Sequence, residues 1–209
     1  MALRPLLEAD GWNTFGWQRY MSTGALPPWR LVICFLGRVA PVGYWWDSTA
    51  GKDQGCIRAN LTEPLRLVRE IWSRREKKAE PYVCFFGGSN PQKIMPGYAP
   101  YNASKMGLLK LVEQMDAESF DTTIFALGPG YVSTKIHQAT LIANWPNERI
   151  ARGDKGTPIE QIYRCLKWCV EQPKGIIGGR NICASDPWGT ELAERLKANP
   201  ALYKLRRVE

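Results

Sequence analysis

The sequence predicts an α/β fold in which helices cover both faces of a parallel sheet. Short runs rich in β-branched and aromatic residues are bounded by glycine or proline, which is typical of buried strands. These runs lie at residues 30–37, 81–88, 121–128 and 174–184. Helical patterns separate them, at about residues 60–77, 99–118 and 158–171. Alternation of this regularity indicates a parallel sheet, because each helix carries the chain back to the start of the next strand.

Local signals support the individual elements. The runs RLVICFLG, PYVCFFGG and DTTIFALG are nearly continuous in apolar residues, as expected of strands buried on both faces. The helix at 158–171 follows a capping threonine, Thr157, and a proline, Pro158, that is tolerated in a first helical turn. The helix at 99–118 carries an apolar stripe for packing, formed by Met106, Leu108, Leu109, Leu111, Val112 and Met115.

Length and composition favour a single globular domain. The chain has 209 residues, of which 44% are hydrophobic and 23% charged. No run of 18 apolar residues occurs and the first residues include acids, so we expect no membrane span, no secretion and a cytoplasmic location. The six cysteines lack metal-binding spacing and read as buried thiols in a reducing compartment. With a single histidine, His137, the sequence predicts no metal site and no Ser/His triad.

The chain is basic, with a net charge of +8 and a pI near 9.3. This charge suits an anionic partner, either nucleic acid or an anionic cofactor and substrate. The densest basic run, residues 73–80, follows an amphipathic stretch and is most simply the solvated end of a helix. No zinc-finger spacing or aromatic RNA-binding signature accompanies it, so nucleic-acid binding is the least favoured function.

The spacing Tyr-x-x-x-Lys occurs three times, at Tyr101/Lys105, Tyr131/Lys135 and Tyr163/Lys167. Parallel sheets bind ligands beyond the carboxyl ends of their strands, so position in the fold separates the three pairs. The first pair opens a helix reached by a loop from the strand at 81–88, and it is expected at the ligand edge. The second pair also follows a strand directly. The third pair lies within a helix, where a packing or outer-face role is expected.

The order of polar residues around the first pair resembles the short-chain dehydrogenase/reductase family over about residues 30–185. The matching parts are Asn60, Ser89, Tyr101, Lys105 and the segment GPGYVST at 128–134. The resemblance implies a Rossmann-like, doubly wound, three-layer sheet and hydride transfer between NAD or NADP and a carbonyl or alcohol substrate. It also implies that Tyr101 is the acid/base and that Ser89 positions the substrate oxygen. Lys105 would lower the phenol's pKa and hold the nicotinamide ribose, and Asn60 would support a water relay.

The same resemblance assigns cofactor contacts. It places the nicotinamide carboxamide on Pro129, Gly130, Val132 and Thr134, puts Gly37 on the adenine side, and makes Arg19 a partner for the 2'-phosphate of NADP. Each residue has a simpler interpretation. Asn60 and Thr134 are good helix-capping residues, Pro129-Gly130 makes a turn, and Arg19 suits any surface. Ser89 also stands one residue after the family's usual serine position, which falls on Gly88.

The family's opening strand and Gly-x-x-x-Gly-x-Gly turn have no counterpart. The segment STGALPP at 22–28 carries two prolines where the turn needs free N–H groups. We therefore expect a degenerate cofactor half at 1–29, a core at 30–185 and a C-terminal tail at 186–209 within one domain. Three explanations of the missing strand and turn stay open. One is a start placed too late, another is a rearranged sheet in which residues 12–18 pair with residues 30–36, and the third is an assembly that covers the gap.

Two further expectations concern partners and function. By resemblance, the helices at 60–77 and 99–118 pack between subunits, which predicts a homodimer or homotetramer. The loop at 137–157 is expected at the substrate, with Trp145, Arg149 and Arg152 suited to an aromatic or anionic molecule. The missing turn leaves an alternative to an oxidoreductase, namely a catalytically impaired relative with a structural or interaction role.

Overall fold

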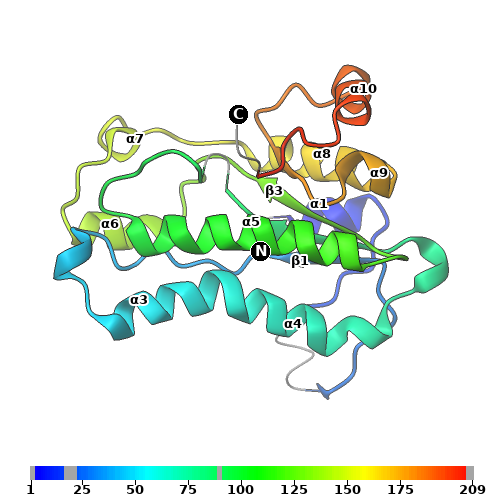
Figure 1. Cartoon of the computed structure of the whole chain (residues 1–209), viewed down its shortest axis with the longest axis horizontal. Coiled ribbons are helices and arrows are strands. Elements are labelled where there is room, and N and C mark those ends of the chain that lie inside the picture. Colours follow the sequence, from blue (N-terminus) through cyan, green and yellow to red (C-terminus); the bar gives the residue numbers. More distant parts are fainter. Residues whose placement is uncertain (1–2, 17–22, 89–90, 206–209) are drawn as a thin grey trace.

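The computed structural model describes residues 3–16, 23–88 and 91–205 (Figure 1). Its centre is a sheet of four parallel strands in the order β1-β2-β3-β4. The strands are β1 (Leu31–Cys34), β2 (Tyr82–Phe86), β3 (Thr123–Gly128) and β4 (Asn181–Cys183). Sequential neighbours pair throughout, and Ile33 of β1, Cys84 of β2 and Phe125 of β3 lie in one row across the sheet. Among the described residues, no strand pairs with the other edge of β1.

Helices cover one face of the sheet with an aliphatic core. They are α3 (Ala50–Ile57), α4 (Glu63–Ile71) and α5 (Ala99–Glu118), with a single π turn (Arg58–Thr62) joining the first two. Val68 of α4 and Leu108 and Val112 of α5 are almost completely buried against Val83 and Phe85 of β2. This face forms because alternate residues of a strand point the same way.

A second core fills the opposite face. Here lie α1 (Arg4–Ala9), α8 (Ile159–Val170), the short α9 (Lys174–Ile177) and α10 (Thr190–Ala198). Cys84 and Phe125 point to this side and meet Leu166 of α8, while Leu192 and Leu196 bring α10 into the same core with no exposed surface. The molecule is therefore a doubly wound, three-layer α/β sheet of the Rossmann type, as the sequence predicts.

Short helices and loops gather beyond the carboxyl ends of the strands. They include 3₁₀ turns at Trp45–Asp47 and Lys135–His137, then α6 (Gln138–Ile142) and α7 (Glu148–Ala151). In Figure 1 the first of these turns, α6 and the start of α5 lie at the same end of the molecule. None of the helices described is both long enough and apolar enough to cross a membrane.

The first three predicted strands and the helices at 99–118 and 158–171 are confirmed, whereas three details were wrong. The helical region before β2 already begins at Ala50, and the run at 174–184 starts with α9 before it becomes β4. Helix α8 has Pro158, not Thr157, at its N-cap. Of the three open explanations for the missing first strand, the pairing of residues 12–18 with 30–36 is not found in the described part, since residues 12–16 form no strand. After α1 the chain turns at Gly11, in the left-handed region, and the Thr14 side chain bonds Arg4 and Glu8 of α1 instead of a neighbouring strand.

Candidate active site

Tyr101 and Lys105 lie one turn apart at the start of α5, where the loop from β2 enters the helix. Lys105 is only 4% exposed, and its ammonium donates a 2.6 Å hydrogen bond to the carbonyl of Phe86, the last residue of β2. Burial lowers the pKa of this lysine to about 8. The pair thus occupies the carboxyl edge of the sheet, where the sequence predicts it.

The electrostatics at Tyr101 differ from the expectation. Burial raises the pKa of the phenol, and the nearby Cys56 thiol raises it further. The predicted lowering of the phenol's pKa by Lys105 is therefore wrong for the protein without ligands, because loss of solvent around the buried phenol dominates the shift. Tyr101 consequently holds its proton firmly at neutral pH.

Asn60 sits in the π turn between α3 and α4 and is completely buried. Its side-chain oxygen accepts a 2.8 Å bond from the Arg38 backbone N–H, and its Nδ2 donates to the Arg38 carbonyl at 2.8 Å. The same Nδ2 donates to Ser104 Oγ at 2.9 Å, and Ser104 donates to the Tyr101 carbonyl at 2.6 Å. Asn60 therefore caps no helix here. It links the loop after β1 to the turn of α5 that carries Tyr101.

Two members of this network were missed by sequence reasoning. Ser104 precedes Lys105 and lies three residues after Tyr101, so helical spacing alone could have placed its hydroxyl under the first turn of α5. Cys56 stands four residues before Asn60, and its thiol accepts from Asn60 Nδ2 at 3.4 Å and donates to the Arg38 carbonyl at 3.3 Å. Both residues are buried polar groups whose hydrogen bonds are satisfied within the site.

The predicted cofactor loop lies beside this network. Gly37 follows β1, and a Cβ built on it would lie 3.4 Å from Ile136 Cδ1 and 3.7 Å from Asn60 Oδ1. The turn at Lys135–His137 is thereby close to Asn60, and Thr134 stands at its N-cap position without a side-chain capping bond. The Thr134 side chain therefore does not cap this turn. Gly37, Asn60 and Ile136 therefore lie close together.

The preceding part of that loop is held by backbone contacts. Gly130 adopts φ +81°, the left-handed region that suits glycine. Val132 forms an isolated antiparallel bridge with Gly156, and the Thr157 N–H donates to the Tyr131 carbonyl at 2.7 Å. The ring of Tyr131 packs on His137 with centroids 4.7 Å apart. Pro129-Gly130 thus opens a structured loop that returns towards α8.

Gly88 explains why no serine occupies the family's usual position. Its φ of +113° lies where side chains are strained, and its carbonyl accepts a 2.9 Å bond from Asn181 Nδ2. A serine at Gly88 would need another backbone conformation. Ser89, and Arg19 of the expected NADP site, lie outside the described residues.

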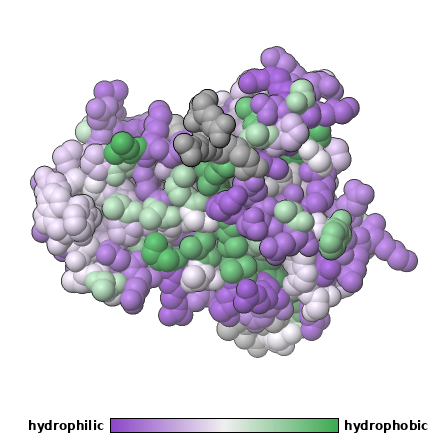
Figure 2. Space-filling view, in the orientation of Figure 1, coloured by the Kyte–Doolittle hydropathy of each residue, from purple (hydrophilic) through white to green (hydrophobic). Residues whose placement is uncertain are grey.

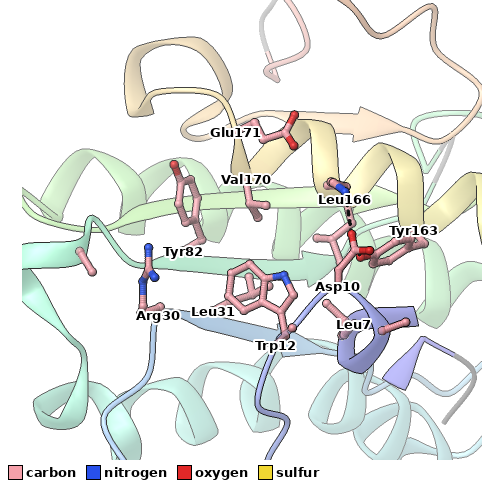
Figure 3. Close-up of a pocket in the computed structure, with 14 residues that line it drawn as sticks. Leu7, Asp10, Trp12, Arg30, Leu31, Tyr82, Tyr163, Leu166, Val170 and Glu171 are labelled. Carbon is pink, nitrogen blue, oxygen red and sulfur yellow. Dashed lines mark hydrogen bonds and ion pairs between the residues drawn. The ribbon is translucent and has the colours of Figure 1, made fainter. Parts of the chain in front are cut away.

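The third Tyr/Lys pair serves packing. Tyr163 and Lys167 of α8 both donate to Asp10 Oδ2 at 2.6 Å, which ties α8 to the end of α1 (Figure 3). Burial and the Asp10 carboxylate raise the pKa of Tyr163 to about 12. A cavity of about 680 Å³ opens beside this contact, with Trp12 and Arg30 in its wall. It lies at the amino ends of β1 and β2, the edge opposite Tyr101.

Comparison with known proteins identifies the fold. A short-chain dehydrogenase/reductase from Saccharomyces cerevisiae superimposes with a TM-score of 0.56 at 17% identity, covering 92% of this chain and 83% of its own. A 4-hydroxyisoleucine dehydrogenase complexed with NADH gives 0.59 at 20% identity, covering 79% and 70%. Other solved structures with this fold hold NADPH, NADP or NAD. The fold is that of the short-chain dehydrogenases/reductases, as the motifs predict.

Sequence comparison adds one curated relative. An uncharacterized oxidoreductase from Thermotoga maritima is 23% identical over 133 residues, which cover 60% of this chain and 52% of the relative. The chain therefore spans about half the length of the curated relative that it matches. No protein-family model matches the sequence.

Proposed function

We propose that this protein is an NAD- or NADP-dependent oxidoreductase that transfers hydride between the nicotinamide and a carbonyl or alcohol carbon. The observation that carries the proposal is the network that joins Arg38, Asn60, Ser104 and Tyr101 above the buried Lys105. A network of satisfied buried polar groups is costly to build and fixes its members in one geometry. The neighbours that hold NADH, NADPH, NADP or NAD and the oxidoreductase from Thermotoga maritima support the same chemistry.

In the reducing direction, Tyr101 acts as the general acid. Its raised pKa keeps the phenol protonated at neutral pH, so that it donates its proton as negative charge develops on the substrate oxygen. The nicotinamide, when bound, supplies or accepts the hydride. Lys105, with a pKa of about 8, is largely protonated at pH 7 and stabilises the phenolate that remains. In the oxidising direction the phenolate takes the proton back, and higher pH favours this direction.

The residues present fit one end of the dinucleotide better than the other. Lys105, Pro129, Gly130, Val132 and Thr134 would hold the nicotinamide and its ribose, because Lys105 is buried at the strand end and the Thr134 hydroxyl caps no helix. Gly37 lies against Ile136 and the buried Asn60, next to the same loop. The stretch 22–28 does not suit the diphosphate, because it carries Pro27 and Pro28 in place of N–H donors.

The decisive experiment replaces Tyr101 with phenylalanine. NADPH and NADH oxidation is measured with a panel of ketones and aldehydes, and Tyr101→Phe is expected to abolish turnover while leaving cofactor affinity intact. Tyr163→Phe is the matched control, because it removes the same hydroxyl from a pair with the same spacing, whose hydroxyl donates to Asp10 at the opposite edge of the sheet. Full activity in Tyr101→Phe, or equal losses in both variants, would remove Tyr101 from the mechanism.

Pro27 and Pro28, which stand in the stretch 22–28 where a diphosphate would need N–H donors, favour a second candidate, a catalytically impaired relative with an interaction role. Calorimetric titration with both cofactors separates the two, because saturable binding at micromolar concentrations requires the nicotinamide site and a pure scaffold shows none. We further propose a reducing, cytoplasmic location, supported by six buried free thiols. A homo-oligomer built through α4 and α5 is proposed by resemblance.

A further inference from the structure

Exposed apolar side chains gather at the end of the molecule that carries the candidate active site. Seven of the nine exposed large hydrophobic residues among the described ones come from three chain segments there, namely the 3₁₀ turn at Trp45–Asp47 with Tyr44, the loop before α5, and α6. Trp45 is 70% exposed, Ile94 is 93% exposed and Ile142 is 85% exposed. We call this set the aromatic rim, and its members are Tyr44, Trp45, Trp46, Ile94, Met95, Leu141 and Ile142. A patch of this kind marks an interaction surface.

Ring contacts and hydrogen bonds join these three segments into one surface. The Tyr44 ring stacks on Trp46 with centroids 4.7 Å apart, and the edge of Trp145 meets Tyr44 at 5.0 Å. Trp145 Nε1 donates to the Pro96 carbonyl at 3.0 Å, next to Met95 in the chain. The Trp145 N–H donates to the Thr140 carbonyl at 3.2 Å, beside Leu141 and Ile142. Figure 1 shows these segments at one end, and Figure 2 shows that end paler than the purple surface around it.

The chain segments that carry the aromatic rim have an excess of positive charge. Residues 38–58, 91–98 and 131–157 contain eight lysines and arginines and only four acids. Three of the acids are already engaged, since Asp53 accepts from Ser48, Glu148 pairs with Arg152 and Asp154 pairs with Arg149. Within the described part of the chain, five of the cations form no ion pair: Arg38, Lys52, Lys93, Lys135 and Lys155.

The exposed aromatic and aliphatic side chains, together with the positive charge, limit which class of partner can bind the aromatic rim. A second copy of the chain would bring the same basic loops together, and like charges oppose such a contact. A small molecule cannot cover the rim, because the hollow between Tyr44, Lys52 and Pro100 measures only about 90 Å³. Tryptophan and tyrosine with protruding aliphatic side chains are typical of residues that enter the interfacial layer of a bilayer. Lysines beside them add attraction to anionic lipids.

We propose that the aromatic rim docks this protein onto an anionic phospholipid surface. Trp45, Ile94 and Ile142 enter the interfacial layer, while Lys52 and Lys93 lie at the level of the headgroups. Pro100 in the hollow precedes Tyr101, so docking turns the entrance of the candidate active site towards the lipid. The attachment is peripheral and does not depend on the proposed catalytic activity.

Co-sedimentation with vesicles tests the proposal. Vesicles of phosphatidylcholine with about one third phosphatidylserine are compared with pure phosphatidylcholine. The unaltered protein is expected to pellet with the anionic vesicles and much less with the neutral ones. The double variant Trp45→Ser/Ile94→Ser should lower the partition coefficient at least about tenfold, because two apolar side chains no longer leave water. Lys52→Ala should lower it roughly fivefold, since one cation near such a surface contributes about 1 kcal/mol.

Phe120→Ser provides the matched control. Phe120 is 97% exposed but lies in the turn between α5 and β3, at the amino end of the strands, so its loss is expected to leave vesicle binding unchanged. All four substituted side chains are exposed, and circular dichroism checks that each variant folds. The proposal is overturned if the unaltered protein ignores anionic vesicles, if Trp45→Ser/Ile94→Ser binds normally, or if Phe120→Ser loses as much binding as the double variant.

Discussion

Replacement of Lys105 by methionine should make the protein more stable at neutral pH. The Lys105 ammonium is 4% exposed, and no carboxylate among the described residues forms an ion pair with it. Methionine fills a similar volume without a charge and adapts to irregular packing. The substitution therefore removes a buried cation and largely keeps the volume that its side chain fills.

The magnitude follows from the pKa of the lysine. Burial lowers it from 10.5 to about 8, and each unit corresponds to about 1.4 kcal/mol, so the charge costs the folded state about 3 kcal/mol at pH 7. Methionine also forfeits the bond to the Phe86 carbonyl, worth about 1 kcal/mol. The net gain in the free energy of unfolding is about 2 kcal/mol.

The stability difference between Lys105→Met and the unaltered protein should depend on pH. Below pH 8 the lysine is protonated in both states, and the full penalty applies. Between about pH 8 and 10.5 the unfolded chain binds more protons than the folded one, so the unaltered protein becomes more stable as pH rises. Lys105→Met lacks this gain, and its advantage should vanish near pH 10. Other groups titrate in the same range, but they cancel in the difference between the two proteins.

Urea denaturation followed by circular dichroism at pH 7 and at pH 10 measures both free energies of unfolding. A variant that is less stable at pH 7, with a difference that stays constant as pH rises, would refute the view of Lys105 as a desolvated cation. The measurement needs neither cofactor nor substrate, so it tests the electrostatics of the site separately from its proposed chemistry.

Substitutions at two further positions test a buried hydrogen-bond cluster and a close contact between loops. Arg180 is 2% exposed and donates to carbonyls of Gly175, Ile176, Leu196, Asn199 and Leu202. Arg180→Met should lower the free energy of unfolding in urea by at least about 3 kcal/mol, and Arg180→Lys should not restore it, because an ammonium lacks the planar set of donors. Gly97 has φ +83°, and a Cβ there would approach the Trp145 ring to 2.2 Å. Gly97→Ala should displace Trp145, lower the melting temperature through a loss of about 1–3 kcal/mol and change the tryptophan fluorescence; an unchanged spectrum would contradict this contact.

The strands and the long helices could be predicted because their signals are local. The apolar runs ending at Phe86 and Gly128 and the stripe on α5 depend only on neighbours in sequence. The location of Tyr101 could also be predicted, because a loop that leaves the carboxyl end of a parallel strand lies at the ligand-binding edge of the sheet. Three similar Tyr/Lys pairs could be separated by position in the fold, and the contact of Tyr163 and Lys167 with Asp10 is consistent with that reasoning.

Features that depend on distant contacts could not be read from the sequence. Helix α3 has little amphipathic pattern, because its buried residue Cys56 faces the polar network instead of an apolar core. The start of the run at 174–184 becomes helical as Lys174 turns to bond Asp116 and the Thr122 carbonyl, two groups more than fifty residues away. The raised pKa of Tyr101 could not be predicted either, because it results from how deeply the phenol is buried, and a sequence motif gives no information on burial.

The π turn at Arg58–Thr62 sets the rotational phase between α3 and α4. An α-helix advances about 100° per residue, so one residue fewer in this turn would rotate α4 by that angle relative to α3. Cys56 could then stay beside Asn60 only if Val68 and Ile71 left their side of the sheet. Because of this single π turn, α3 directs Cys56 towards the polar network at the candidate site, while α4 directs its apolar residues towards the core. A one-residue deletion here should therefore be far more damaging than most point substitutions on the same helices.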